Sequence, residues 1–524
     1  MKEEMEYDTT KSQETLLMPT ARIGTRHFVT FMLFLGMANA YIMRTNMSIA
    51  IVAMVNHTAL PRNKDIPVDF DECHLVGVNN VTTKKVPLKD GKFIWTSVEQ
   101  STILSAFFYG YVITQIPFGI LSKKYGASYF LGIGMLINSV FGLLVPIAAE
   151  NSFFMLVLVR FIQGLGEGPI VPCTHAILAK WIPPNERSRM GAFVYAGAQF
   201  GTVVAMPVSG YLSEYGFSDG WPSIFYVFGV VGLLWSISFL LTVYNDPHSH
   251  PKIAEDEKKY IVTSVWGIGG ISEQNIPWKK IVASSAFWAI LIAHMAQNYG
   301  YETLLTQLPT FMQQILHFDI KSNGINSALP YLAMWLFSMF VSVLADAMIS
   351  SKRFSITITR KIINSIGQYG PAVALICASY TGCNQFLTVT LLTVGMGLNG
   401  AIYSGFKVNH LDISPRFAGI LMSFTNCLAN FSGLIAPNVA GFLINKRPTQ
   451  AAWRVVFFIA AGIYILGATI YLIFASGIRQ EWDDKRLISE RRHENDSTVE
   501  NGANIDKNNV LLRVTNGTFD TVKH

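Results

Sequence analysis

FFMLVLVRFIQGLGEGPIVPCTHAILA, residues 153–179, decides how the chain is organised. The stretch is apolar and long enough to cross a bilayer, yet Arg160, Gln163 and Glu167 lie inside it at a spacing that puts them on one helix face. Ionisable side chains inside hydrocarbon are costly, and they are tolerated where they face water or a partner. This face is therefore predicted to line a polar path. The alternative is a structural pair of Arg160 with Glu167 that fixes helix packing.

The composition of the chain excludes an ordinary soluble protein. Of its 524 residues, 51% are hydrophobic and 14% are charged, and the mean hydropathy is +0.34. Soluble domains average about a quarter charged residues, so the apolar excess predicts membrane-embedded segments and a lipid bilayer as a partner. The formal net charge of +6 is small and lies in loops and tails, which argues against a nucleic-acid partner.

Twelve apolar segments, each near the roughly twenty residues that span hydrocarbon, predict an all-α membrane protein with twelve transmembrane helices. They are residues 28–55, 98–121, 128–149, 152–179, 190–213, 222–244, 285–312, 325–349, 360–380, 385–409, 417–443 and 453–476. We expect two six-helix bundles, at 28–244 and 284–476, joined by a cytoplasmic linker at 245–283. Residues 1–27 and 477–524 are polar and are predicted to be cytoplasmic tails, the first without a cleavable signal peptide.

Two segments in matching positions of the two halves resemble one another. Residues 191–212 and 419–443 each follow a loop with proline and arginine, and each has near its end a proline that is followed within four residues by a small residue and a glycine. The likeness is short and could reflect only convergent packing of small residues between helices. Because these segments are the fifth and eleventh of the twelve, we favour an internal repeat, a common plan in transporters with a midplane site.

The loops indicate the orientation in the membrane. Lysine and arginine gather in the loops of one side and in the linker, which predicts that this side and both termini are cytoplasmic. The long loop 56–97 then lies outside the cell or in a lumen, and it carries two glycosylation sequons, at Asn56 and Asn80. Cys73 and Cys383 fall on the same side, so a disulfide between them is conceivable. The five cysteines have no metal-ligand spacing, and no metal site is predicted.

Four strings carry a resemblance to a known family: FFYGYVITQIPFG (107–119), RFIQGLGEGPIVPCTHAILAKWIPPNERSR (160–189), YAGAQFGTVVAMPVSG (195–210) and GFKVNHLDISPRFAGILM (405–422). In these the chain resembles the major facilitator superfamily, specifically the anion–phosphate cotransporter family that includes sialin, the vesicular glutamate transporters and the type I sodium–phosphate cotransporters. The resemblance covers most of residues 28–476. It implies two six-helix bundles that rock about a central cavity and admit an anion from alternate sides.

The resemblance assigns roles to four residues of the first half. Arg44 and Arg160 match arginines associated with anion binding, and each guanidinium can hold a carboxylate or phosphate through two hydrogen bonds. Glu167 matches a glutamate linked to proton coupling, and His175 matches a histidine that could relay protons. The alternatives are a snorkelling side chain for Arg44 and a structural buried histidine for His175.

The seventh segment adds three candidates and departs from some relatives. Asn298 and Tyr301 are predicted to hydrogen-bond the substrate, with core packing as the alternative for the tyrosine. Glu302 stands where relatives typically have an aromatic residue, so it is either a second proton or sodium site or a partner of a cavity arginine. Leu104 and Gln297 replace a histidine and an arginine of the vesicular glutamate transporters, which weakens a glutamate assignment.

Together these features predict a secondary active transporter, a symporter that moves a small organic anion by alternating access with protons as the coupling ion. The alternatives are a sodium-dependent inorganic phosphate cotransporter and, in another class, a non-transporting membrane sensor or scaffold, against which the retained charges argue. The sequence has no nucleophile–base pair, phosphate loop or metal cluster, so neither an enzyme nor a cofactor beyond H⁺ or Na⁺ is expected. We expect a monomer in the plasma membrane or a lysosomal or vesicular membrane, with a carboxylate, acidic sugar or phosphate as its substrate.

Overall fold

The computed structural model describes residues 24–56, 91–266, 276–351, 353–414, 417–445 and 449–483. The described part is helical, apart from one isolated bridge between Val55 and Phe93. Asn80, Cys73 and most of both predicted tails lie outside the described residues. The helices confirm the predicted all-α class.

Twelve membrane-length segments follow one another, and three of them are broken into shorter helices. The elements are, in chain order, α1 (Thr25–Met54), α2 (Ser97–Tyr125), α3 (Ala127–Asn151), α4 (Phe153–Glu167), α5 (Ile170–Trp181), α6 (Pro184–Tyr215), α7 (Pro222–Thr242), α8 (Glu255–Trp266), α9 (Trp278–Val282), α10 (Ser285–Gln314), α11 (Ile320–Ser350), α12 (Ile356–Ala378), α13 (Gln385–Asn399), η1 (Gly400–Tyr403), α14 (Phe406–Ile413), α15 (Ala418–Ala429), α16 (Phe431–Ile444), α17 (Gln450–Phe474) and η2 (Glu481–Asp483). The linker helices α8 and α9 were not anticipated from the sequence.

Ten helical stretches of the described chain are long and apolar enough, by length and composition, to cross a membrane. Helices α10 and α12 complete the set of twelve; they have 30 and 23 residues but are more polar. In α10, the polar side chains of His294, Gln297 and Glu302 are buried. These groups face neighbouring helices, which explains how a polar helix can belong to a membrane bundle.

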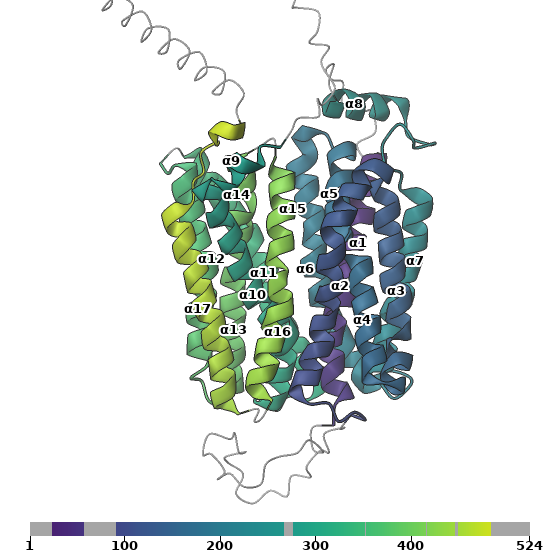
Figure 1. Ribbon diagram of the computed structural model, residues 1–524, viewed down its shortest axis with the longest axis vertical. Helices are drawn as coiled ribbons and strands as arrows, with labels where there is room; N and C mark the ends of the chain where they lie inside the picture. The colour runs from purple at the N-terminus through teal and green to yellow at the C-terminus, as the bar shows by residue number, and fades with distance from the viewer. Residues whose placement is uncertain are drawn as a thin grey trace, which may run out of the picture.

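The helices form two groups that stand side by side (Figure 1). Helices α1–α7 make one group, here called the N-bundle, and α10–α17 make the other, the C-bundle. Most buried hydrophobic residues belong to two large clusters, one within residues 29–261 and one within residues 281–482, which Ile49 and Met206 of the N-bundle join. Each bundle therefore has a core of its own.

The two bundles touch at the end where α1 finishes, which we call the loop end. Gly210 of α6 packs against Gly324 of α11, and the Ser105 hydroxyl of α2 donates to the Leu434 carbonyl of α16 at 3.4 Å. Towards the opposite end, no atom of another described element lies within 4 Å of the position that a Cβ on Gly191 of α6 would take. The described bundles are thus packed together at the loop end.

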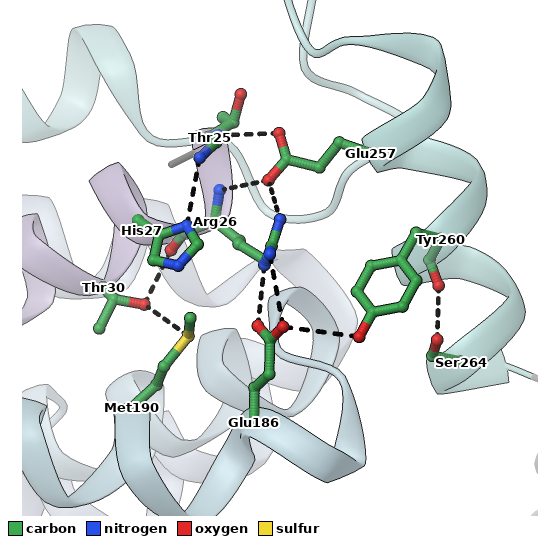
Figure 2. A network of polar contacts seen from close by, with 10 residues as sticks. Thr25, Arg26, His27, Thr30, Glu186, Met190, Glu257, Tyr260 and Ser264 are labelled. Carbon is green, nitrogen blue, oxygen red and sulfur yellow. Dashed lines mark hydrogen bonds and ion pairs between the residues drawn. The ribbon is translucent and has the colours of Figure 1, made fainter. Parts of the chain in front are cut away.

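At the opposite end, α8 is fastened to the N-bundle by four side chains that we call the linker clasp: Arg26, Glu186, Glu257 and Tyr260 (Figure 2). Arg26 pairs through Nε with Glu186 at 2.8 Å and through Nη1 with Glu257 at 2.9 Å. The Glu257 carboxylate also accepts the backbone N–H groups of Thr25 and Arg26, and so caps the first turn of α1. Burial and the charge of Glu186 raise the pKa of the Tyr260 phenol, which stays neutral. The clasp holds the linker to the N-bundle.

The first residues of the predicted polar C-terminal tail make contacts with the C-bundle. The backbone N–H of Gln480 donates to the Ile413 carbonyl at 2.9 Å. The Ser414 hydroxyl donates to the buried Asp483 carboxylate at 2.6 Å. Residues 477–483 therefore pack against the C-bundle, where the Ser414 hydroxyl satisfies the buried Asp483 carboxylate.

Candidate functional site

The stretch that organises the sequence folds into two helices, not one. The Ser152 hydroxyl accepts the Met155 N–H and caps the start of α4. Helix α4 ends at Glu167, where Gly168 and Pro169 intervene before α5 begins. Proline has no N–H to continue a helix, so the break falls directly after the glutamate.

The glycines of α4 allow very close helix packing. A Cβ on Gly164 would collide with the backbone carbonyl of Phe107 in α2, and a Cβ on Gly166 would collide with that of Gly134 in α3. Only glycine permits backbones to approach this closely. Helix α4 is thereby fixed between α2 and α3, and so is the depth of Glu167.

Arg44 of α1 and Glu167 of α4 form a buried ion pair. The Nη2 and Nε atoms of Arg44 lie 2.8 and 3.0 Å from the same carboxylate oxygen, Oε1. The two side chains are only 5% and 2% exposed, so Arg44 does not snorkel to an interface. The alternative considered from the sequence was an ion pair between Arg160 and Glu167. In the structure, Arg44 forms the ion pair with Glu167.

The other oxygen of Glu167 leads to Arg160. Asn138 of α3 donates from Nδ2 to Glu167 Oε2 at 3.0 Å, and Gln163 Nε2 donates to Asn138 Oδ1 at 3.3 Å. Gln163 Oε1 accepts from Arg160 Nη1 at 3.0 Å. A continuous hydrogen-bonded chain therefore joins the two arginines. Sequence reasoning missed Asn138, although a lone asparagine in an otherwise apolar span was a usable signal.

Glu302 of α10 brings the C-bundle into the same cluster. Its Oε1 lies 3.8 Å from Nη1 of Arg44, and its Oε2 has no hydrogen-bond partner among the described residues. The Nε atom of Arg160 is likewise without a partner in the described part of the chain. Buried polar atoms are normally satisfied, so these two atoms mark positions where a ligand or water can bind. We call Arg44, Arg160, Glu167 and Glu302, with Asn138 and Gln163, the central cluster.

Aromatic rings enclose the arginines of the central cluster. The Arg44 guanidinium carbon lies 4.7–5.6 Å from the centroids of four rings, which are those of Tyr41, Phe107, Phe108 and Tyr111. Phe107 also lies 5.1 Å from the guanidinium of Arg160. Ring faces attract cations, so they replace part of the hydration that the guanidiniums have lost.

The central cluster is closed to solvent in this structure. Arg160, Glu167 and Glu302 are each 1% exposed, whereas the sequence predicted a face that lines a wet path. The difference has a physical reason. The charges of the two guanidiniums and the two carboxylates sum to zero, and opposite charges attract strongly in low dielectric, so the cluster can be packed without bulk water.

Two predicted substrate-binding residues lie on α10. The Asn298 amide donates to the Ala429 carbonyl at 3.0 Å and to the Ser432 hydroxyl at 3.2 Å. It therefore joins α10 to the break between α15 and α16. Tyr301 is buried and packs edge to face against Tyr331, with ring centroids 5.9 Å apart.

The remaining predicted positions have contacts with residues outside the central cluster. The His175 ring packs against Tyr195 with centroids 4.9 Å apart. Asn56 follows α1, where its backbone N–H donates to the Phe93 carbonyl at 2.8 Å. Cys383 is disulfide-bonded and is not a free thiol. Among the residues that the structure describes, no group of three or more His, Cys, Asp or Glu side chains could hold a metal ion.

The fold and this buried charge cluster can now be set against known proteins. Residues 32–437 match the family described as Major Facilitator Superfamily. The chain belongs to the major facilitator superfamily. A Drosophila melanogaster relative named "Putative inorganic phosphate cotransporter" is 65% identical over 472 residues, covering 89% of this chain and 88% of the relative. Sialin of Homo sapiens is 39% identical over 460 residues, covering 88% and 91%. Vesicular glutamate transporter 2 of Bos taurus is 33% identical over 485 residues, covering 91% and 79%.

Solved structures support the fold of this superfamily member. A bacterial homologue of the human lysosomal transporter Spinster, in an inward-facing and unoccupied conformation, superimposes with a TM-score of 0.63 at 16% identity, covering 86% of this chain and 98% of that one. A D-xylose–proton symporter gives a TM-score of 0.61 at 16% identity, covering 87% and 99%. Together with the relatives, these results identify a multi-pass secondary transporter of the phosphate and sialin type. It is not an enzyme.

Proposed function

We propose that this transporter is a symporter that carries a small anion and a proton across the membrane together. The observation that carries the proposal is the position of the Arg44 guanidinium, between Glu167 of the N-bundle at 2.8 Å and Glu302 of the C-bundle at 3.8 Å. An incoming carboxylate or phosphate uses the same donors as these two carboxylates. Anion binding and release of the carboxylates are therefore linked.

The balance of charge in the central cluster indicates where a proton would bind in the transport cycle. Two ionised guanidiniums and two ionised carboxylates sum to zero, so a monoanion entering the cluster adds an uncompensated buried charge. Protonation of Glu167 removes one negative charge and frees the Arg44 donors for the anion. Each species therefore favours binding of the other, which is the thermodynamic requirement for symport.

Inorganic phosphate is the first anion to test. The relative named as a phosphate cotransporter is 65% identical, whereas sialin and the vesicular glutamate transporter are 39% and 33% identical. Phosphate also suits the site chemically, because its oxygens can engage two guanidiniums at once. Organic carboxylates are the second class to test.

Uptake into proteoliposomes tests the proposal. The purified chain should accumulate labelled phosphate under an imposed pH gradient with sodium replaced by choline, and a protonophore should abolish the accumulation. Glu167→Gln should lose accumulation but keep the exchange of labelled for unlabelled phosphate, since exchange moves no net protons. Glu186→Gln in the linker clasp is the matched control and should still accumulate phosphate. Accumulation that requires sodium and ignores the pH gradient would contradict proton coupling and favour the sodium-dependent alternative.

A further inference from the structure

A third cation, Lys407 of the C-bundle, lies beside the boundary between the two bundles. Lys407 lies in the first turn of α14, with its ammonium 4.6 Å from the centroid of the Tyr403 ring. The Tyr403 hydroxyl accepts a hydrogen bond from Gln199 of α6, so this ring stands at the boundary between the two bundles. Lys407 therefore presents its ammonium beside that boundary.

The ammonium of Lys407 is not committed to a carboxylate. None of the ion pairs formed by described residues includes it. The acid on its own helix, Asp412, is held by Arg360 of α12 at 2.7 Å. An ammonium has three N–H donors. An aromatic ring face attracts its positive charge but is only a weak hydrogen-bond acceptor for these N–H groups. Lys407 thus keeps donors for an anion.

Buried hydrogen bonds hold the turn that presents Lys407. The Lys407 carbonyl can only accept, so His410 Nδ1 donates to it, at 3.1 Å. A neutral imidazole then accepts at Nε2, from the Thr425 hydroxyl at 2.9 Å, and the Thr425 oxygen accepts from His294 Nδ1 at 3.2 Å. This chain ties α14 to α15 and α10, so the backbone of Lys407 is anchored on three helices.

We propose that Lys407 is the anion-binding residue of the C-bundle and that it selects doubly charged oxyanions, such as hydrogen phosphate. The inference rests on the proposed function and names its substrate class. Arg44, Arg160 and Lys407 supply three positive charges. When Glu167 is protonated, Glu302 is the one carboxylate of the central cluster that remains charged. The three cations and this carboxylate then have a net charge of +2, which a dianion neutralises. Without Lys407 the same site would match a monoanion.

Two anions that share a sulfonyl group but differ by one charge, sulfate and methanesulfonate, test this inference together with inorganic phosphate. Binding is read from the thermal stabilisation of the detergent-solubilised full chain as each anion is titrated. For Lys407→Gln the apparent Kd of phosphate and sulfate should rise about 10-fold or more, while that of methanesulfonate stays within about 2-fold. Lys407→Arg keeps the charge and should keep the preference for dianions.

Lys321→Gln is the matched control, because Lys321 also lies over a tyrosine ring, that of Tyr215 at 5.2 Å, but at the loop end. It should bind all three anions as the wild type does. If Lys407→Gln binds the dianions normally, or weakens all three anions equally, or if Lys407→Arg loses the preference, the inference is overturned and the proposed function stands. A wild-type chain that binds none of the three anions overturns the proposed function, and this inference with it.

Discussion

Two clusters in this molecule each place one arginine between two glutamates, Arg26 in the linker clasp and Arg44 in the central cluster. In the linker clasp, Arg26 contacts its two carboxylates at 2.8 and 2.9 Å, and all its partners belong to the N-bundle or to the linker helix α8. In the central cluster, Arg44 contacts one carboxylate at 2.8 Å and the other at 3.8 Å, and the longer contact crosses between the bundles. The same residue types therefore join the linker helix to the N-bundle in one cluster and the two bundles to each other in the other.

Hydrogen-bond saturation distinguishes the two clusters better than burial does. In the clasp, Glu257 accepts two backbone N–H groups in addition to the guanidinium. In the central cluster, Glu302 and Arg160 each keep one polar atom without a partner among the described residues. Saturated networks make a structure rigid, whereas a partly unsatisfied buried network keeps polar atoms that a water or a ligand can engage. Four substitutions can break or sharpen this comparison.

Loss of the central arginine is expected to have the largest effect. Arg44→Ala leaves Glu167 buried without its partner, which costs about 3–5 kcal/mol of stability in comparable pairs. It also removes an anion donor, so phosphate uptake per folded molecule should fall at least about 30-fold. Thermal melts and proteoliposome uptake measure the two quantities. Uptake that stays within a few-fold of wild type would mean that Arg44 only holds helices together.

Loss of the clasp arginine should instead affect stability more than transport. Arg26→Ala removes charge-assisted hydrogen bonds worth about 1.5–3 kcal/mol each at most and releases α8. We expect a lower melting temperature and faster proteolysis near α8, with uptake per folded molecule reduced less than about 3-fold. The comparison fails if uptake collapses while the melting temperature is unchanged.

Glu302→Gln sharpens the comparison within the central cluster. The 3.8 Å contact with Arg44 lacks a hydrogen bond, so removing its charge should cost little stability. It also removes a competitor of the anion, and the KM for phosphate should fall by about 2- to 5-fold. Initial uptake rates give the KM, with Glu302→Asp as the charge-retaining control. A raised KM would show that Glu302 helps to bind the substrate.

The smallest effect is expected at the exposed side of the clasp. The Glu186 side chain is 23% exposed, so its pair with Arg26 is screened by salt. Glu186→Gln should cost about 0.2–1 kcal/mol at low ionic strength and less at high ionic strength. Melting temperatures of variant and wild type at both ionic strengths test this. A difference that ignores salt would place Glu186 among the fully buried charges.

The sequence predicts well what depends on local composition. Runs of apolar residues revealed the twelve segments, and charges inside those runs singled out Arg44, Arg160 and Glu167. The partner of Glu167 could not be read in the same way. It depends on the relative depths of α1 and α4, which are fixed by glycine packing between helices that are far apart in the sequence.

The linker clasp was invisible in the sequence for a related reason. Arg26 and Glu257 are separated by 231 positions, and both stand in polar segments where charged residues are expected. Helix α8 is too short and too polar to give a hydrophobic signal of its own. Its docking depends on a carboxylate that meets the exposed amides of another helix, and no local pattern encodes that meeting.

The contact of Glu302 with Arg44 also has a consequence for how the transporter would return to its starting conformation. The Glu302 carboxylate of the C-bundle lies beside the Arg44 guanidinium of the N-bundle, so the protein itself supplies a counter-charge for this buried cation. In the proposed symport cycle, this pairing would let the empty transporter reorient without taking a second anion back across the membrane.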